Sequence, residues 1–246
     1  MNPESGGEAL GRRQTLEEEY AQLVAPQVEQ FLTDVQRAAL TGALSAIAVT
    51  ALWGALLERI RNRGASSTLV DSLADSPIPT VAFESAQFAV ATAVGAGMTA
   101  AQRRALVRES LGLEGDKIGS MSTPGGGFSW RGSTYSAIRT AATADFGDSM
   151  LNQLYAEGYT HKRWMTRYDS RVRDSHVHAD RMTVKLDEPF IVGGIALRYP
   201  GDPMAADISE VINCRCVLIG VNFGDRPLDH PAGTEPWLNP RPVQPA

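Results

Sequence analysis

The sequence predicts an α+β protein, with a mostly α-helical N-terminal half and a small α+β C-terminal domain of short antiparallel strands. Apolar residues recur at helical spacing from residue 16 to about residue 60, which indicates long helices with one buried stripe. After Trp164 the pattern changes to short runs rich in β-branched and aromatic residues. Residues 112–132 between the two parts are rich in glycine, which predicts a flexible linker.

The predicted helical region covers residues 15–111. Its first helix should start at a capping-box pattern, in which Thr15 stands three residues before Glu18. Pro26 either kinks this helix or opens a second one, and the helical pattern continues to the basic residues and glycine at 59–64. A loop with a short helical turn is expected at 64–79, with helices at about 81–95 and 99–111. Residues 1–14 are predicted to be disordered, and the proline-rich tail at 223–246 is predicted to be extended or disordered.

The C-terminal domain is predicted to span residues 133–222. A helix should run from Ser133 to Gly158, and short strands are expected at 184–186, 190–192, 195–199 and 216–221. Gly193 and Gly194 separate the second and third of these strands, which is a signal for a two-residue hairpin.

Composition narrows the class of protein. A hydrophobic content of 43% is typical of a globular chain. The net charge of −5 argues against a protein that coats DNA throughout. Two cysteines one residue apart make no disulfide scaffold. Gly125–Gly127 lacks the lysine of a phosphate-binding loop, and no nucleophile elbow is present. These observations favour a protein that is not an enzyme and has no cofactor.

One dense signature stands in the last third of the chain. It reads W, then D-x-R-x-R-x-x-H, LDEPF-x-V-x-G, L-x-YPGDP and INCRC. Its defining residues, which we interpret as fold-specifying rather than catalytic, are Trp164, Asp169, Arg173, His176, Asp180, Phe190, Pro200, Gly201, Asp202, Asn213, Cys214 and Cys216. In this order and spacing the signature resembles the Mu F-like domain, the phage head morphogenesis or minor head protein domain of tailed bacteriophages.

The resemblance implies a structural virion protein of a tailed bacteriophage. Such a minor head protein would act in head morphogenesis, with DNA packaging or ejection as further roles, and residues 15–111 would dock on the portal protein. Further implied partners are the major capsid protein and packaged DNA, with multiple copies in each particle. The implied location is the head and portal region of the virion, after assembly in the host cytoplasm. Two alternatives stay open: a nucleic-acid-processing enzyme using the His176 region, and a membrane-active ejection protein using the uncharged stretches 38–57 and 85–102.

Two imidazoles and two thiols in the signature region are of the ligand types that bind zinc. They belong to His176, His178, Cys214 and Cys216. Some Mu F-like relatives have cysteines at the positions of Arg173 and His176, and a histidine at the position of Val211. Because this chain lacks two of those three candidates, the sequence favours cysteines that pack as core residues without a metal. Zinc binding stays open as the alternative.

The polar residues of the signature are expected to pair with one another. Asp169, Arg173 and His176 would share one helical face if their segment is helical. Arg173 would fork onto Asp169 or Asp202, and His176 would hydrogen-bond a carboxylate or a carbonyl group. The Tyr199–Pro203 segment should form a rigid turn. A basic segment could touch phosphate, although such runs are more often solvated faces; it comprises His161, Lys162, Arg163, Arg167, Arg171 and Arg173.

Overall fold

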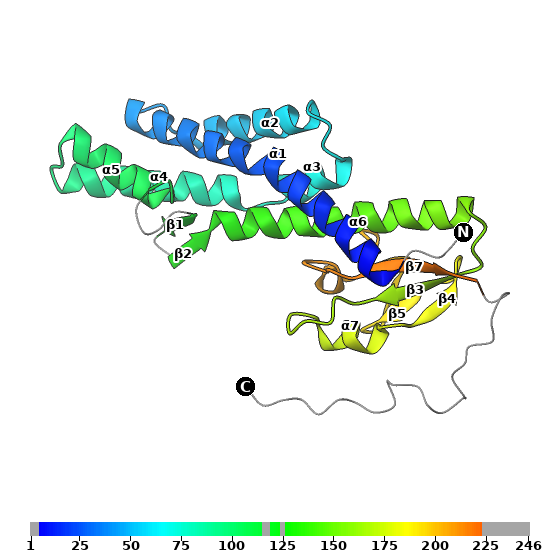
Figure 1. Ribbon diagram of the computed structural model, residues 1–246. Helices are drawn as coiled ribbons and strands as arrows, with labels where there is room; N and C mark the ends of the chain where they lie inside the picture. Colours follow the sequence, from blue (N-terminus) through cyan, green and yellow to red (C-terminus); the bar gives the residue numbers. More distant parts are fainter. Residues whose placement is uncertain (1–4, 115–118, 124–125, 223–246) are drawn as a thin grey trace. The chain divides into compact units, whose positions relative to one another are not determined.

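The computed structural model describes residues 5–114, 119–123 and 126–222 (Figure 1). The chain divides into a helical unit, residues 13–145, and a C-terminal unit, which combines residues 1–12 with 146–246. The α+β class is confirmed. The division does not fall in the predicted linker; it falls within helices α1 (Gly6–Thr41) and α6 (Trp130–Ala156). The predicted tail at 223–246 lies outside the described residues.

Helix α1 begins nine residues earlier than its predicted start, so the prediction of disorder over residues 1–14 is wrong for residues 6–14. The capping box is at Ser5 and Glu8. The Ser5 backbone N–H donates to the Glu8 carboxylate at 2.8 Å, and the Glu8 N–H donates to the Ser5 hydroxyl at 3.3 Å. Tertiary contacts hold the first turns, because Ala9 is fully buried and the Arg12 guanidinium lies 5.4 Å from the centre of the Phe146 ring. Pro26 lies inside the helix without ending it.

The predicted continuous helix through residues 38–57 is broken. Helix α1 ends at Thr41, Gly42 follows with a φ of 78°, and α2 (Ala46–Arg61) starts anew. Ser45 caps α2 by accepting a hydrogen bond from the Ala48 N–H. The uncharged stretch is thereby shared between two helices. Among the residues that the structure describes, none of the helices combines the length and the apolar character needed to cross a membrane.

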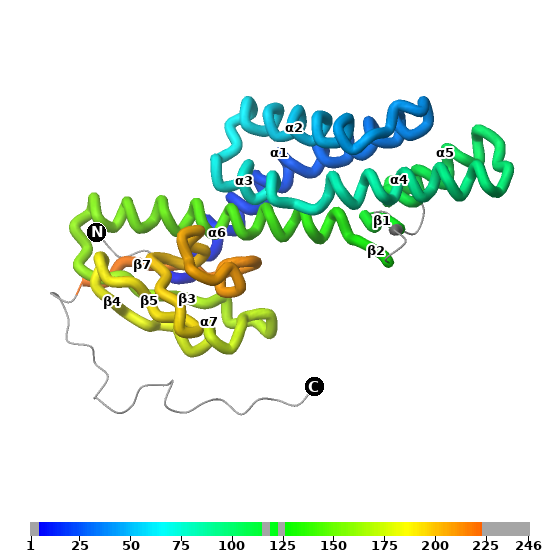
Figure 2. The backbone as a smooth tube through the Cα atoms, turned by 180° about the vertical axis from the view of Figure 1, so that it is seen from behind, coloured from blue at the N-terminus to red at the C-terminus, as the bar shows by residue number. Residues whose placement is uncertain are grey.

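The rest of the helical unit follows the predicted order. Helix α4 contacts α2, α5 and the first strand, β1 (Ser120–Thr123), and Figure 2 shows this group from behind. Helix α5 starts at a complete capping box formed by Thr99 and Gln102. The remaining helices of this unit are α3 (Ser67–Ala74), α4 (Ile78–Gly95) and α5 (Ala100–Ser110).

The predicted linker at 112–132 is in large part structured. Strand β1 pairs antiparallel with β2 (Gly126–Ser129), and α6 begins directly afterwards at Trp130. Met121 and Trp130 are buried, and the Trp130 indole N–H donates to the Gly112 carbonyl at 3.4 Å. These two apolar side chains attach the hairpin to the helical core, and glycine composition alone does not reveal them.

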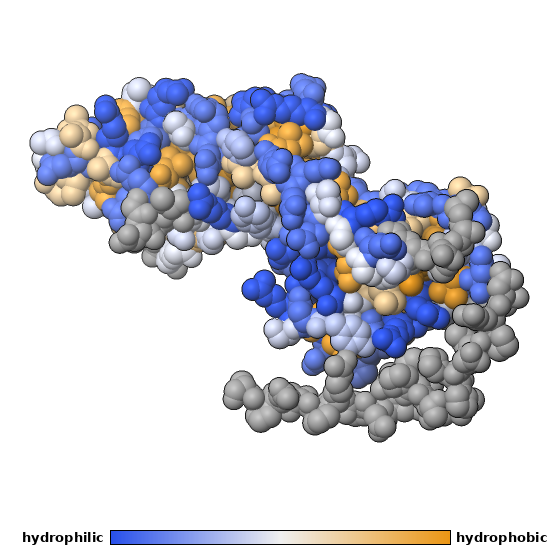
Figure 3. Space-filling model, viewed as in Figure 1, coloured by the Kyte–Doolittle hydropathy of each residue, from blue (hydrophilic) through white to orange (hydrophobic). Residues whose placement is uncertain are grey.

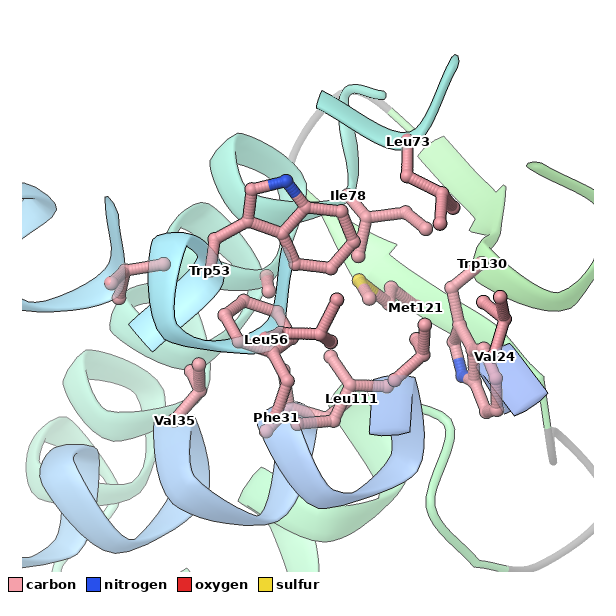
Figure 4. Packing of buried hydrophobic residues seen from close by; sticks show 14 of the residues in the cluster. Val24, Phe31, Val35, Trp53, Leu56, Leu73, Ile78, Leu111, Met121 and Trp130 are labelled. Atoms are coloured by element: carbon pink, nitrogen blue, oxygen red, sulfur yellow. The ribbon is translucent and has the colours of Figure 1, made fainter. Parts of the chain in front are cut away.

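The core of the helical unit is one apolar cluster. Phe31 of α1 meets Trp53 of α2 edge to face, with ring centroids 4.9 Å apart. In Figure 4, side chains from the helices and the β1 strand point toward one another. The labelled members are Val24, Phe31, Val35, Trp53, Leu56, Leu73, Ile78, Leu111, Met121 and Trp130.

The C-terminal unit holds a three-stranded antiparallel sheet in the order β4-β3-β7 and a separate β5–β6 hairpin. The hairpin turns at Gly193 and Gly194, both with positive φ, as predicted. The central strand β3 was not predicted. The elements are β3 (His161–Met165), α7 (Asp174–Ala179), β4 (Thr183–Lys185), β5 (Phe190–Val192), β6 (Ile195–Leu197), the 3-10 helix η2 (Ile208–Glu210) and β7 (Val217–Val221).

Gly147 of α6 provides a first prediction. A Cβ atom on Gly147 would lie 2.5 Å from Cδ2 of Tyr199 and 2.9 Å from the Pro200 carbonyl oxygen. We expect Gly147→Ala to lower the free energy of unfolding by about 1–3 kcal/mol, because overpacking outweighs the gain in helix propensity. Gly54→Ala in α2 is the matched control. Nothing lies within 4 Å of its Cβ position, so it should be neutral or stabilising by up to about 1 kcal/mol in the same urea titration. Equal effects at the two positions would contradict the close packing.

Candidate functional site

His176 lies at the centre of a buried polar cluster. Its Nδ1 atom is 3.4 Å from Sγ of Cys216 and 3.7 Å from Sγ of Cys214. Its Nε2 atom is 2.9 Å from Oε2 of Glu210, which also accepts a hydrogen bond from the Ser175 hydroxyl at 2.8 Å. The predicted hydrogen bond from His176 to a carboxylate is thus confirmed.

The two cysteines come from an extended segment just before β7, rather than from the strand itself. Both thiols are buried in the same core, as predicted. The side chain of Arg215 between them reaches the Asp169 carboxylate instead, at 2.5 and 2.6 Å. Alternation along an extended chain therefore separates a thiol pair on the inside from an ion pair on the outside.

Aromatic rings enclose the cluster. Trp164 of β3 lies edge to face with the His176 ring, at a centroid distance of 5.4 Å, and with Phe190, at 5.3 Å. The surrounding buried residues are Trp164, Ala179, Phe190, Val192, Leu197, Val211, Cys214 and Cys216. Five residues of the sequence signature therefore meet in one small core.

The three central side chains shift one another's titration. Burial alone would raise the pKa of Cys214, but hydrogen bonds with Cys216 and His176 lower it well below its usual value. The same contact with Cys214, together with burial, raises the pKa of Cys216. Burial lowers the pKa of His176, yet the hydrogen bond and charge of Cys214 and the charge of Glu210 raise it overall. The two thiols are therefore not equivalent, because the pKa of Cys214 is lowered and that of Cys216 is raised.

Two other candidate side chains serve different purposes. His178 is exposed, and its Nδ1 atom lies 2.7 Å from the Asp174 carbonyl of its own helix, so it does not join His176 and the cysteines. The Asp180 carboxylate accepts hydrogen bonds from the backbone N–H and the hydroxyl of Thr166, at 2.8 and 2.9 Å. Asp180 therefore anchors the chain after β3.

The predicted arginine pairings need correction. Helix α7 starts at Asp174, so Asp169 is not on a helical face with His176. Arg173 donates to the Ile212 carbonyl, so the predicted fork onto Asp169 or Asp202 is wrong. Arg215 takes Asp169, and Arg198 takes Asp202. Arg215 and Asp169 are 46 residues apart in the sequence. Arg198, by contrast, lies only four residues before Asp202, and this local pairing was not predicted.

Asp202 is the acceptor of the Tyr199–Pro203 turn. The predicted turn forms: Gly201 has a φ of 82°, and the Asp202 N–H donates to the Tyr199 carbonyl at 3.2 Å. The buried Asp202 carboxylate accepts from Arg198 Nη2 at 2.7 Å, Arg198 Nε at 2.9 Å, and the backbone N–H groups of Arg198 and Met204, both at 3.0 Å. Burial raises the pKa of Asp202, but these bonds lower it below the usual value.

Part of the basic segment points inward. Lys162 is buried, donates to the Arg198 carbonyl at 2.8 Å, and lies 5.4 Å from the centre of the Phe190 ring. Burial lowers the pKa of Lys162 to about 8. Arg163 donates to the Thr183 hydroxyl at 2.9 Å. These two cations support the sheet.

Sequence reasoning missed Glu210, which stands four residues before Cys214. Asn213, just before Cys214, adopts a left-handed φ of 56°. Glu210 carries no local signal, because its bond to His176 joins residues 34 positions apart.

No family model, curated protein or solved structure matches this chain.

Proposed function

We propose that this chain is a structural virion protein of a tailed bacteriophage, a minor head protein of the Mu F-like type that associates with the portal during head morphogenesis. The observation that supports the proposal is that the central residues of the signature are buried in the fold and bond to one another. Trp164, Phe190, Cys214 and Cys216 are core residues, and His176 bonds inward to Glu210. A motif of this kind specifies a fold.

The same contacts give less support to an enzyme. A general acid or base needs a free side chain within reach of a substrate. The His176 ring is 1% exposed and bonded through both nitrogens, and Asp180 is bonded to Thr166. Internal bonds of Lys162 and Arg163 also give less support to a DNA contact through the basic segment. The portal protein is therefore the partner that we favour.

The helical unit offers surfaces for docking. The exposed positions of α2 before Glu58 carry no charge; they are Ala46, Ile47, Thr50, Ala51, Gly54 and Ala55. The exposed positions of α4 after Glu84 are also uncharged; they are Gln87, Phe88, Ala91, Thr92, Val94 and Gly95. In Figure 3, pale and tan residues gather where α4 leads into α5. Small uncharged faces allow close approach of another helix, so we propose that α2 and α4 contact the portal protein.

A pull-down from purified particles or infected cells tests this proposal. The tagged wild-type chain should enter particles and bring the portal protein with it. Ala51→Glu and Ala91→Glu place a charge on the two uncharged faces at exposed helical positions, so the fold should persist while portal recovery falls at least about tenfold, as expected when a charge enters an interface.

The matched control is Ala105→Glu, the same change on α5, where Arg104 is already exposed. This variant should recover the portal protein like the wild type. Normal recovery with both Ala51→Glu and Ala91→Glu would contradict docking through these faces. A wild-type chain that is absent from particles would contradict the virion role itself.

A further inference from the structure

We propose that His176, Cys214 and Cys216 bind one zinc ion, with Nδ1 and the two Sγ atoms as ligands. This inference rests on the cluster alone and does not depend on the proposed virion role. The three ligand atoms lie within 4.8 Å of one another, and they are the only such group of His, Cys, Asp and Glu side chains in residues 5–114, 119–123 and 126–222. Thiolates and imidazoles are the ligands that structural zinc sites use.

The distances match those that zinc imposes. With Zn–S bonds of about 2.3 Å and Zn–N bonds of about 2.0–2.1 Å at tetrahedral angles, a nitrogen and a sulfur ligand lie about 3.6 Å apart. The Nδ1–Sγ distances here are 3.4 Å to Cys216 and 3.7 Å to Cys214. An ion can therefore enter with little movement of the side chains. Three protein ligands leave one tetrahedral position for a water molecule.

Glu210 orients the histidine for this role. Its carboxylate can only accept, so Nε2 of His176 carries the hydrogen and Nδ1 is the nitrogen that faces the sulfurs. Metal-bound histidines commonly have this arrangement, with the second ring nitrogen held by a carboxylate. The Ser175 hydroxyl holds the same Glu210 oxygen at 2.8 Å.

A hydrogen-bond donor next to the sulfur atoms also supports a zinc site. The indole Nε1 of Trp164 is fully buried and has no oxygen or nitrogen partner among the described residues. It interacts with the Cys216 thiol instead. A metal-bound thiolate is a better acceptor for this N–H group than a neutral thiol, so zinc would also satisfy the indole.

The backbone around the ligands is fixed from both sides. The Arg215–Asp169 pair holds the segment between the two cysteines, and Arg173 holds the Ile212 carbonyl before them. Zinc would join α7 to the chain entering β7, across 38 residues. The sequence favoured cysteines packed without metal, because two of the candidate ligands of some Mu F-like relatives are missing here. The side-chain geometry changes that interpretation.

Elemental analysis of the full chain, purified from zinc-supplemented cells, tests the site. We expect about one zinc per wild-type chain, and loss of that zinc in His176→Ala, Cys214→Ser and Cys216→Ser. His178→Ala is the matched control: it removes an exposed histidine two residues away and should retain the zinc. Glu210→Gln should retain the ligands but weaken zinc in competition with a chelator by about 10–100-fold.

A second measurement covers variants that fail to fold. Wild-type chain stripped by a chelator and loaded with Co²⁺ should show thiolate-to-cobalt absorption and the intense d–d bands of tetrahedral cobalt, and its melting temperature should rise on loading. A folded wild-type chain without zinc and without these bands would overturn the proposal. Loss of zinc in His178→Ala to the same extent as in His176→Ala would overturn the assignment of the ligands.

Discussion

Trp164→Ala should be the most damaging single truncation in the C-terminal unit, lowering the free energy of unfolding by about 3–5 kcal/mol. The indole is fully buried and packs edge to face against both His176 and Phe190. Its removal would leave a cavity between β3 and the cysteine segment, and the surrounding side chains would lose their contacts across it. Denaturant unfolding followed by circular dichroism measures the loss.

Tyr155→Ala is the control for that measurement. This aromatic side chain lies near the end of α6 and is 52% exposed, so its truncation should change stability by no more than about 0.5 kcal/mol. A loss below about 1 kcal/mol in Trp164→Ala would mean that the aromatic core does not hold this unit together.

Asp202→Asn should lower the free energy of unfolding by about 2–3 kcal/mol. The carboxylate is buried and accepts four hydrogen bonds that close the Tyr199–Pro203 turn. An amide can replace only some of them and removes the charge that the Arg198 guanidinium faces. The expected loss of stability is no larger, because the Arg198 side chain is half exposed and water screens its ion pair with Asp202. Asp71→Asn, at an exposed position of α3, should change stability by less than about 0.5 kcal/mol.

The effect of Asp202 should depend on pH in a definite direction. Its folded-state pKa is lowered, so its contribution is fully present above the ordinary Asp pKa of about 3.9. The contribution is lost as the pH falls below that value and passes through the folded-state pKa. The wild-type chain and Asp202→Asn should therefore differ by a constant amount near neutral pH and converge in acid. A difference that persists unchanged in strong acid would contradict an ionised Asp202.

Local signals predicted much of the fold. The Gly193–Gly194 hairpin and the start of α5 at Thr99 were visible because turn and cap residues act on their neighbours in sequence. Strand β3 was missed because its basic residues hide its apolar face. Lys162 is buried in that strand only because its ammonium group reaches a carbonyl 36 residues away. A pattern of polar and apolar residues cannot show such a partner.

The candidate site, like the fold, could be predicted only in part. Order and spacing identified His176, Cys214 and Cys216 as special residues, and the prediction that both cysteines pack in the core is confirmed. Glu210 and Arg215 were not identified as partners, because their bonds join residues 34 and 46 positions apart. Arg198 lies only four residues before Asp202, and this local partner was overlooked. The choice between packed thiols and a zinc site needed interatomic distances, which a sequence does not contain.

The division of the chain into units has a consequence for synthesis on the ribosome. The C-terminal unit is discontinuous, because residues 1–12 belong to it while residues 13–145 form the helical unit. Residues 1–12 must therefore wait for residues beyond 145 before their unit can close, whereas the helical unit is complete earlier. We expect the helical unit to fold first on the nascent chain. The start of α1 would then be recruited last, as a late step that follows translation of β7.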